Sequence, residues 1–373
     1  MKILKNILLL IHMARFACAI LSKDNLLHNL AIISKLAPKS KIIAMVKANA
    51  YGHGLRSVSK YLDDLNLYSF GVASIDEAVA LRNANVSSSI TLMEGVFEPE
   101  ELSVAAAENF DVVLHNWEQL EWLEKIINTE NKYRVWLKID TGMGRLGFSV
   151  EEAPMAYAKL SSLKNISFPI GVMSHLACAE DKEHRLNQVQ IKNFTQFITN
   201  LPVIKSFCNS AGIFNFPDQH YDVVRPGIIL YGLSPFKDKT GPDLGLRPVM
   251  TLKSKLISVK IVSAGGTIGY GARAVCNKDT KIGVIAMGYG DGYPITAKDG
   301  APIWINNKIC PLIGRVSMDM MCIDLTNYPD AKIGDEVEFW GNNLPLEQLS
   351  KYTHNLNYDI STNVQNRVKF IWK

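Results

Sequence analysis

The chain lacks the features that mark several broad classes of protein. It has no run of about 18 uninterrupted apolar residues, so no transmembrane helix or membrane partner is expected. Its formal net charge of +4 is small for 373 residues, and no basic tract exceeds short Lys-x-Lys pairs, so nucleic acid is not expected as a partner. The six cysteines have neither Cys-x-x-Cys nor zinc-ligand spacing: Cys18, Cys178, Cys208, Cys276, Cys310 and Cys322. Sparse cysteines in a long chain indicate cytosolic thiols, without a disulfide framework or a metal site.

The N-terminus superficially matches a secretory signal, with residues 17–19 as a small-residue cleavage site. However, His12 and Arg15 interrupt the apolar stretch. Residues 15–21 also have the pattern of a first strand, which cleavage would destroy. We therefore interpret residues 1–12 as an N-terminal extension and expect a cytoplasmic protein.

Hydrophobic residues make up 47% of the chain and charged residues 20%, which is typical of a globular chain long enough for two domains. From residue 22 to residue 245, apolar runs of strand length alternate with helical patterns. The expected strands are residues 41–47, 69–73, 90–93, 111–114, 133–139, 169–174, 205–208 and 221–230. Eight such units in roughly 210–230 residues are typical of a TIM (β/α)8 barrel.

After residue 245 the pattern changes to short β-rich runs divided by turn residues. The clearest of these runs are residues 281–287, 303–310, 321–325 and 336–340. We predict an α/β barrel over residues 22–245 and a mainly β domain over residues 246–373, which the strand near residues 15–21 joins.

The run Met-Val-Lys-Ala-Asn-Ala-Tyr-Gly-His-Gly at residues 45–54 is the most informative segment. Lys47 stands at the carboxyl end of an apolar strand. Burial disfavours a charged ammonium, which leaves a lysine amine able to form a Schiff base. The small residues that follow leave room for a ligand near the backbone, and Tyr51 adds a hydroxyl. The plainer alternative is that Lys47 is simply where the strand reaches water.

Polar residues stand at or just beyond the carboxyl ends of several predicted strands: Lys47, His115, Asp140, His175, Asn209 and Arg225. The active sites of TIM barrels lie at this end of the strands, so the pattern predicts a shared site at the mouth. Each residue taken alone also has an ordinary explanation, because loops are polar, and His175 alone would be interpreted as a core histidine.

Lys138 differs because it lies inside a predicted barrel strand, where a charge must be paired or modified. The alternatives are a side chain that points outward, a pair with Asp140, or a chemically modified amine.

Residues 142–147 match the Gly-x-Gly-x-x-Gly fingerprint of dinucleotide-binding proteins. That motif needs an acidic residue about 20 positions later for the ribose, but no Asp or Glu lies between Glu152 and Glu180. The motif also follows the fifth predicted strand rather than the first. A dehydrogenase is therefore not expected.

Eight blocks, in order over nearly the whole chain, together resemble the alanine racemases. They are VKANAYGHG at 46–54, LKIDTGMGRLGF at 137–148, MSHLACAE at 173–180, CNSAG at 208–212, VRPGIILYG at 224–232, IGYGA at 268–272, MGYGDGY at 287–293 and GRVSMD at 314–319. The first block alone would not exclude other barrel enzymes that use pyridoxal 5'-phosphate (PLP).

The resemblance implies that Lys47 binds PLP covalently and acts as one catalytic base, with Tyr270 as the base on the opposite face. Two bases allow a proton to leave one face of Cα and return to the other, which interconverts enantiomers. The implied cofactor-binding residues are Lys47, Tyr51, His175, Asn209, Ser210, Arg225, Gly227 and Ile228. Arg225 resembles the residue that hydrogen-bonds the pyridine nitrogen in this family. An arginine is a poor proton donor, so that nitrogen should stay unprotonated.

The resemblance also implies that Arg145 and Met318 contact the substrate and that Tyr289 narrows the entrance, although the glycines around Tyr289 also fit a tight hairpin. Lys138 is implied as a carbamylated lysine that braces Arg145. In this family Tyr270, Tyr289 and Met318 reach the site of the other subunit, which implies a head-to-tail homodimer with composite sites.

The expected reaction is the interconversion of L- and D-alanine, which supplies D-alanine for bacterial peptidoglycan. A racemase for serine or lysine is the nearest alternative. A PLP-dependent decarboxylase would favour a carboxylate beside the pyridine nitrogen, so Arg225 argues against this class. A non-catalytic PLP carrier would lack the second domain, so the region of Tyr270 argues against that one. Asn366 stands where several members have a tyrosine before Arg-Val, which removes one phosphate contact and suggests that serine is accepted beside alanine.

Overall fold

A computed structural model describes residues 16–126 and 132–373. The predicted extension at residues 1–12 lies outside the described residues. The chain divides into two compact units, and one of them is the continuous stretch Asn29–Leu230. The other unit, called the second unit below, combines the described residues up to His28 with Tyr231–Lys373. The predicted domain boundary at residue 245 stays a prediction.

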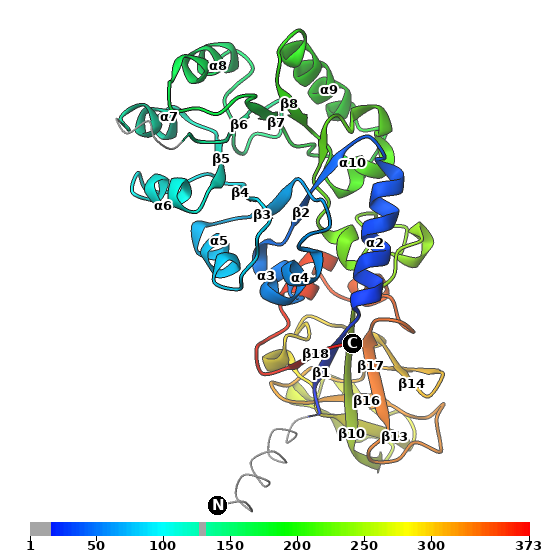
Figure 1. Ribbon diagram of the computed structural model, residues 1–373. Helices are drawn as coiled ribbons and strands as arrows, with labels where there is room; N and C mark the ends of the chain where they lie inside the picture. The colour runs from blue at the N-terminus through cyan, green and yellow to red at the C-terminus, as the bar shows by residue number, and fades with distance from the viewer. Residues whose placement is uncertain (1–15, 127–131) are drawn as a thin grey trace, which may run out of the picture. The chain divides into compact units, whose positions relative to one another are not determined.

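Eight parallel strands of the described chain close into a barrel in the unit Asn29–Leu230 (Figure 1). They are β2 (Lys41–Met45), β3 (Ser69–Val72), β4 (Ile90–Leu92), β5 (Phe110–Leu114), β6 (Val135–Lys138), β7 (Gly171–Met173), β8 (Ile204–Ser206) and β9 (Val223–Val224). Helices cover the outside of the strands, which explains why the strands read as continuous apolar runs. The strand expected over residues 221–230 is shorter, because Pro226 has no N–H group to extend the ladder.

The helices that alternate with these strands are α2 (Lys23–Leu36), α4 (Leu55–Leu62), α5 (Ile75–Arg82), α6 (Glu101–Ala107), α7 (Trp117–Glu124), α8 (Ala153–Ser162), α9 (Arg185–Ile198) and α10 (Ser210–Asn215). Shorter helical segments are α3 (Lys47–Tyr51), η1 (Pro217–Gln219) and η2 (Ile228–Tyr231). In α2 the buried Leu26, Leu30 and Ile33 recur at helical spacing, so one face of the helix is apolar.

The interior of the barrel is filled by large apolar side chains. Ile43, Met45, Met93 and Trp136 belong to one buried cluster. A Cβ atom at Gly171 would lie 2.3 Å from the indole of Trp136, so only glycine leaves room for that ring. The barrel is therefore a packed core, and ligands are restricted to its ends.

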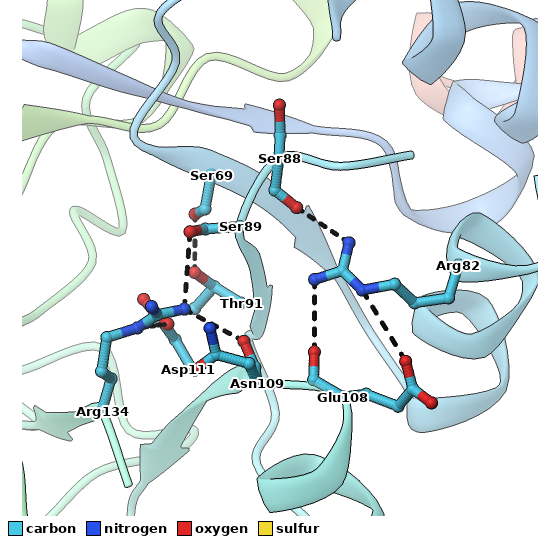
Figure 2. Close-up of polar contacts among 9 residues, drawn as sticks. All are labelled: Ser69, Arg82, Ser88, Ser89, Thr91, Glu108, Asn109, Asp111 and Arg134. Atoms are coloured by element: carbon cyan, nitrogen blue, oxygen red, sulfur yellow. Dashed lines mark hydrogen bonds and ion pairs between the residues drawn. The ribbon is translucent and has the colours of Figure 1, made fainter. Parts of the chain in front are cut away.

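A polar network lies at the amino ends of β3 to β6 (Figure 2). The Arg134 guanidinium donates to the buried Asp111 carboxylate over 2.5 Å and to the carbonyl of Asn109 over 3.0 Å. Burial raises the pKa of Asp111, and the Arg134 charge opposes that rise. Nearby, Arg82 donates to the carbonyls of Ser88 and Glu108. These bonds tie successive strands together at the end of the barrel opposite Lys47, where they serve stability.

The second unit is built mainly from strands. One sheet has the order β15-β14-β17-β10-β1-β18, and β13 pairs with both β10 and β16. The strands are β1 (Cys18–Leu21), β10 (Met250–Val262), β11 (Thr267–Ile268), β12 (Ala274–Val275), β13 (Thr280–Ile285), β14 (Pro302–Ile305), β15 (Lys308–Pro311), β16 (Met321–Asp324), β17 (Glu336–Trp340) and β18 (Lys369–Trp372). The short helical segments are η3 (Pro242–Leu244), η4 (Tyr270–Ala272), η5 (Tyr289–Asp291), α11 (Leu346–Ser350) and α12 (Asn357–Thr362).

Asn306 and Asn307 join β14 to β15 with φ values of 44° and 63°. Two positive φ values are the signature of the tight hairpin turn that matches the twist of its strands. The predicted fold class, a TIM barrel followed by a mainly β domain, is confirmed. In the described part of the chain, no helix has both the length and the apolar character needed to cross a membrane.

Candidate active site

Lys47 follows the carboxyl end of β2 and begins an unusual turn. Ala48, Asn49, Ala50 and Tyr51 have φ values of 52°, 53°, 54° and 53°. Segment α3 is therefore a left-handed turn, although none of these four residues is glycine. The Lys47 Nζ atom lies 3.8 Å from a carboxylate oxygen of Glu94, which follows β4.

Arg225 follows β9 and is buried, with 4% of its surface exposed. Its guanidinium donates to the Ser206 hydroxyl over 2.6 Å and to the carbonyl oxygens of Ser174 and Phe207. Burial lowers the pKa of Arg225 to about 10, which leaves the side chain charged at neutral pH. The strand ends of β7 and β8 thus fix a cation at the mouth of the barrel.

His175 is the next group along from Arg225. Its Nδ1 atom lies 3.4 Å from an Arg225 nitrogen, and its Nε2 atom lies 3.3 Å from the Asn209 side-chain nitrogen. Burial, followed by the positive charges of Arg225 and Arg145, holds the pKa of His175 well below its ordinary value. The ring is therefore neutral, and Nδ1 accepts from Arg225, because a guanidinium always donates.

Lys138 ends β6 and is buried, with 8% of its surface exposed. Burial, and then the charges of Arg225, Arg145 and Lys47, lowers the pKa of Lys138 to about 8. The three neighbours that lower this pKa are all cations, whereas the negative charge of Glu94 raises it. An appreciable share of Lys138 is consequently neutral near pH 7.5.

Asp140 does not neutralise Lys138. Its Oδ1 atom accepts from three backbone N–H groups, those of Gly142, Met143 and Gly144. The carboxylate therefore shapes the loop that carries Arg145, which is exposed. In residues 16–126 and 132–373, Lys138 forms no ion pair within 4.0 Å.

A small group of hydrogen-bonding residues lies beside the left-handed turn, and we call it the cradle. It consists of Tyr51, Ser210, Gly227 and Ile228. The Ser210 hydroxyl accepts from the Gly227 N–H group over 2.9 Å. A Cβ atom at Gly227 would lie 2.3 Å from the Tyr51 hydroxyl oxygen, so glycine is required for this close approach. Burial raises the pKa of Tyr51 to about 12, which keeps its hydroxyl protonated as a donor. Ile228 begins η2, so its N–H group lies where a helix has no acceptor of its own.

His115 has a supporting position. Its Nε2 atom lies 3.0 Å from the Glu94 carbonyl oxygen, and the Gln119 side chain accepts from the His115 N–H group. The turn after β4, which contains Glu94, is tight: Gly95 has a φ of 75°, and a Cβ atom there would lie 2.4 Å from the carbonyl oxygen of Val113.

Glu94 was not among the site residues predicted from the sequence. The rule that selected His115 would have found it, since Glu94 directly follows the strand predicted at residues 90–93.

Three of the predicted site residues belong to the second unit. Tyr270 begins η4 and is 70% exposed, and Met318 is 53% exposed. The Tyr289 N–H group donates to the carbonyl of Ser317, and the Gly290 N–H group donates to the carbonyl of Met318. The loops of Tyr289 and Met318 are thus held side by side. The tight hairpin that was the alternative for this segment is instead the short helical segment η5.

Arg367 clamps these two loops together, and sequence reasoning missed it. Its guanidinium lies 2.9 Å from the Asp291 carboxylate and 2.8 Å from the Asp319 carboxylate, and it donates to the Met318 carbonyl. The only sequence signal was its place directly after Asn366, which is exposed.

The barrel unit therefore joins Arg225, His175 and Asn209 by direct contacts and joins Tyr51, Ser210 and Gly227 in the cradle. Lys47, Lys138 and Arg145 add positive charge around the first group. A site that concentrates cations and neutral donors suits a small anionic ligand, such as a phosphate and a carboxylate. Among the described residues, no group of three or more His, Cys, Asp or Glu side chains has an arrangement that holds a metal ion.

Comparison with known proteins points to one family. The family described as "Alanine racemase, N-terminal domain" matches residues 21–235, and "Alanine racemase, C-terminal domain" matches residues 249–372. An alanine racemase of Coxiella burnetii (strain CbuK_Q154) is 45% identical over 362 residues, which cover 95% of this chain and 98% of that protein.

Solved structures agree. The biosynthetic alanine racemase of Pseudomonas aeruginosa superposes with a TM-score of 0.93 at 37% identity, covering 96% of this chain and 99% of that one. A structure of alanine racemase from Bartonella henselae, described with covalently bound pyridoxal phosphate, has a TM-score of 0.86 at 28% identity and covers 96% and 99% of the two chains.

Proposed function

The chain belongs to the alanine racemase family, and from that premise we propose that it interconverts L- and D-alanine with PLP, using Lys47 and Tyr270 as its two bases. The observation that carries the proposal is the position of Lys47, which stands at the barrel mouth one turn away from the Tyr51 hydroxyl of the cradle. An amine and a candidate anion-binding site would thus stand at the two ends of one turn.

The residues fit PLP by the chemistry of their groups. The Tyr51 and Ser210 hydroxyls and the N–H groups of Gly227 and Ile228 are neutral donors of the kind that hold a phosphate. The Gly227 N–H group donates to the Ser210 hydroxyl in this structure and would exchange that acceptor for a phosphate oxygen. When bound, PLP withdraws electrons from Cα of an amino acid and makes the α-proton acidic. Arg225, whose hydrogen bonds fix it in place, would donate a hydrogen bond to the ring nitrogen without giving up its proton.

Lys47 and Tyr270 would act from opposite faces of the substrate. A base on one face removes the α-proton, and the conjugate acid on the other face returns one, which inverts the configuration. Arg145 would bind the substrate carboxylate, with Met318 contributing its backbone. The arginine partner of the ring nitrogen also disfavours the decarboxylase alternative, which would use a carboxylate there.

The exposure of Tyr270 supports an active site built from two subunits. A general base works best in a site shielded from water, but Tyr270 is 70% exposed within its own chain. We therefore propose a head-to-tail homodimer in which Tyr270, Tyr289 and Met318 of one subunit complete the barrel mouth of the other. Arg367 keeps the loops of Tyr289 and Met318 in register for that role.

We further propose that Lys138 is carbamylated. The neutral amine attacks CO2, an N–C bond forms, and the nitrogen releases a proton to solvent. The lowered pKa of Lys138 provides the neutral amine at physiological pH, and Arg225, Arg145 and Lys47 supply the positive charges that a carbamate anion needs. This carbamate would brace Arg145.

The free energy of unfolding should depend on the protonation state of Lys138. Without CO2, the unfolded chain binds more protons than the folded chain between pH 8 and 10.5, so the free energy of unfolding rises with pH in this window. Below pH 8 the full cost of burying the charge, about 3 kcal/mol, is present. Lys138→Met should then be more stable than the native protein below pH 8 by up to about 3 kcal/mol, a difference that vanishes towards pH 10.5. Urea unfolding in CO2-free buffer measures it.

Bicarbonate should stabilise the native protein and leave Lys138→Met unchanged, because only the native protein can form the carbamate. An equal response of both proteins would contradict carbamylation.

The substrate is tested with purified protein, PLP and a panel of L-amino acids, with chiral detection of the D-products. L-Alanine should give the highest kcat/KM, followed by L-serine, with L-lysine unreactive. Asn366→Tyr should lower the serine-to-alanine ratio of kcat/KM by about tenfold, because a larger side chain narrows the pocket. An unchanged ratio would show that Asn366 does not determine whether serine is accepted. A higher kcat/KM for serine or lysine than for alanine would contradict alanine as the substrate. Supply of D-alanine for peptidoglycan is the role we propose for the product.

A further inference from the structure

The left-handed turn after Lys47 is costly to hold. In this conformation the Cβ atom crowds the following carbonyl, at about 1–2 kcal/mol for each residue that is not glycine. Four such residues follow in sequence, from Ala48 to Tyr51. Backbone strain of this size persists only where surrounding contacts determine the conformation.

Several hydrogen bonds join parts of the turn to one another. The Ala50 N–H group donates to the Val46 carbonyl, and the Asn49 side chain accepts from the Leu55 N–H group. The buried His53 ring contacts the Tyr51 carbonyl through Nδ1 at 2.9 Å. These bonds shape the turn locally.

Glu77 ties the turn to a different βα unit. It lies in the first turn of α5, and one carboxylate oxygen accepts from the Ala48 N–H group over 2.7 Å. The other oxygen accepts from the Ala73 N–H group, just after β3, over 2.9 Å. The carboxylate therefore bridges the loops that follow two neighbouring barrel strands, β2 and β3. A bond between a charged acceptor and a backbone N–H group is among the stronger kinds.

The neighbouring βα units show what is particular to Glu77. In the next unit, Glu101 accepts from the Phe97 N–H group four residues earlier, and Gln119 does the same for His115. Glu77 makes the same local bond to Ala73, four residues earlier. Its second bond, to Ala48, crosses to another loop, so the local cap and the bridge can be separated by experiment.

We infer that Glu77 is a positioning residue for the reaction, acting through the Ala48 N–H group to hold the left-handed turn that sets Lys47 and Tyr51 in place. Ala48 is bonded directly to Lys47, and the turn fixes the separation between the Lys47 amine and the cradle. The inference rests on the proposed function of Lys47. Glu77 itself has no contact with the reacting atoms.

The test compares Glu77→Ala with Glu101→Ala in the full-length chain. Both variants lose a local cap, but only the first loses the bridge. Hydrogen exchange of a peptide covering residues 46–54 is measured with and without PLP, beside the Kd of PLP, the visible circular dichroism of bound PLP, and kcat and KM for L-alanine. Glu77→Gln keeps the shape with one acceptor oxygen and should lie between the native protein and Glu77→Ala.

For Glu77→Ala we expect at least about fivefold faster exchange of the turn without PLP, a PLP Kd raised by at least about fivefold, an altered circular dichroism signal, and a lower kcat with KM nearly unchanged. Glu101→Ala should match the native protein in all of these. Native-like exchange at 46–54 in Glu77→Ala would overturn the inference. So would equal effects of the two variants, or faster exchange with unchanged PLP affinity and dichroism.

The exchange measurement without PLP does not depend on the proposed function. If Lys47→Ala still held PLP covalently, the proposed function would fail while the exchange result stood. If Lys47→Ala lost covalent PLP but Glu77→Ala behaved as Glu101→Ala does, only the inference on Glu77 would fail.

Discussion

Replacing Lys47 with alanine is expected to lower the rate of D-alanine formation by at least about 10³-fold and to abolish covalent retention of PLP. The substitution removes both the amine that holds the cofactor and one of the two proposed bases. Neither of the two nearest cations among the described residues should replace it, since Lys138 is buried on a different strand and Arg225 is fixed by its hydrogen bonds. Chiral chromatography measures the rate, and intact mass after borohydride reduction measures covalent PLP.

Lys41→Ala is the matched control. Lys41 is exposed at the amino end of the same strand, β2, so its loss removes a lysine without touching the mouth. This variant should keep native activity and covalent PLP. A Lys47→Ala protein that still carried PLP after reduction would show that another lysine holds the cofactor, and the assignment of the site to the end of β2 would be wrong.

Replacing Tyr270 with phenylalanine is expected to slow racemisation in both directions by about 10²–10⁴-fold, because each direction needs a base on both faces. The base at Lys47 remains, so one enantiomer should still exchange its α-deuterium with solvent, namely the one whose Cα–H bond faces Lys47. The other enantiomer should lose this exchange. NMR of α-deuterated L- and D-alanine in water measures both rates separately.

The fold should not be disturbed by this change. Tyr270 is exposed within its chain, and such substitutions usually alter stability by less than about 0.5 kcal/mol. Tyr352→Phe, at an exposed tyrosine of the same unit, should retain native racemisation. Equal loss of exchange in both enantiomers would contradict a role for Tyr270 on one face only.

Mixed dimers extend the same prediction to the composite site. When Lys47→Ala and Tyr270→Phe chains are dissociated and reassociated in equal amounts, half of the dimers contain one chain of each kind. If Tyr270 serves the partner's barrel, each mixed dimer has one intact site, and about a quarter of native activity returns. Activity no higher than that of the separate variants would place both bases in one chain.

The barrel was predictable because its signals are local and repeated. Apolar runs of strand length alternate with helical periodicity, and eight such units leave few alternatives. The same rule then placed Lys47, His175 and Arg225 at one end of the barrel, since parallel strands share their direction. It also shows why β9 was overestimated: the apolar run continues past Pro226, but the hydrogen-bond ladder does not.

The left-handed turn could not be predicted from composition. Positive φ values are signalled by glycine or asparagine, but Ala48, Ala50 and Tyr51 favour right-handed conformations. The conformation depends on contacts such as that from Glu77, which lies 29 residues away in sequence. Periodicity does not reveal which carboxylate meets which backbone N–H group.

Arg367 and Glu94 were missed for different reasons. Arg367 acts by joining loops at Asp291 and Asp319, which are distant from it in sequence. Glu94 was visible as a polar residue after a strand, but its proximity to Lys47 appears only in the structure. Only the structure shows which charged groups each of these two side chains meets.

The most direct test of alanine racemisation by this protein is a pair of chiral time courses, started from pure L-alanine and from pure D-alanine, with purified protein and PLP. Enantiomers have equal free energies in water, so both reactions should converge on equal amounts of the two forms. Failure of either enantiomer to yield the other, with PLP bound at Lys47, would contradict it.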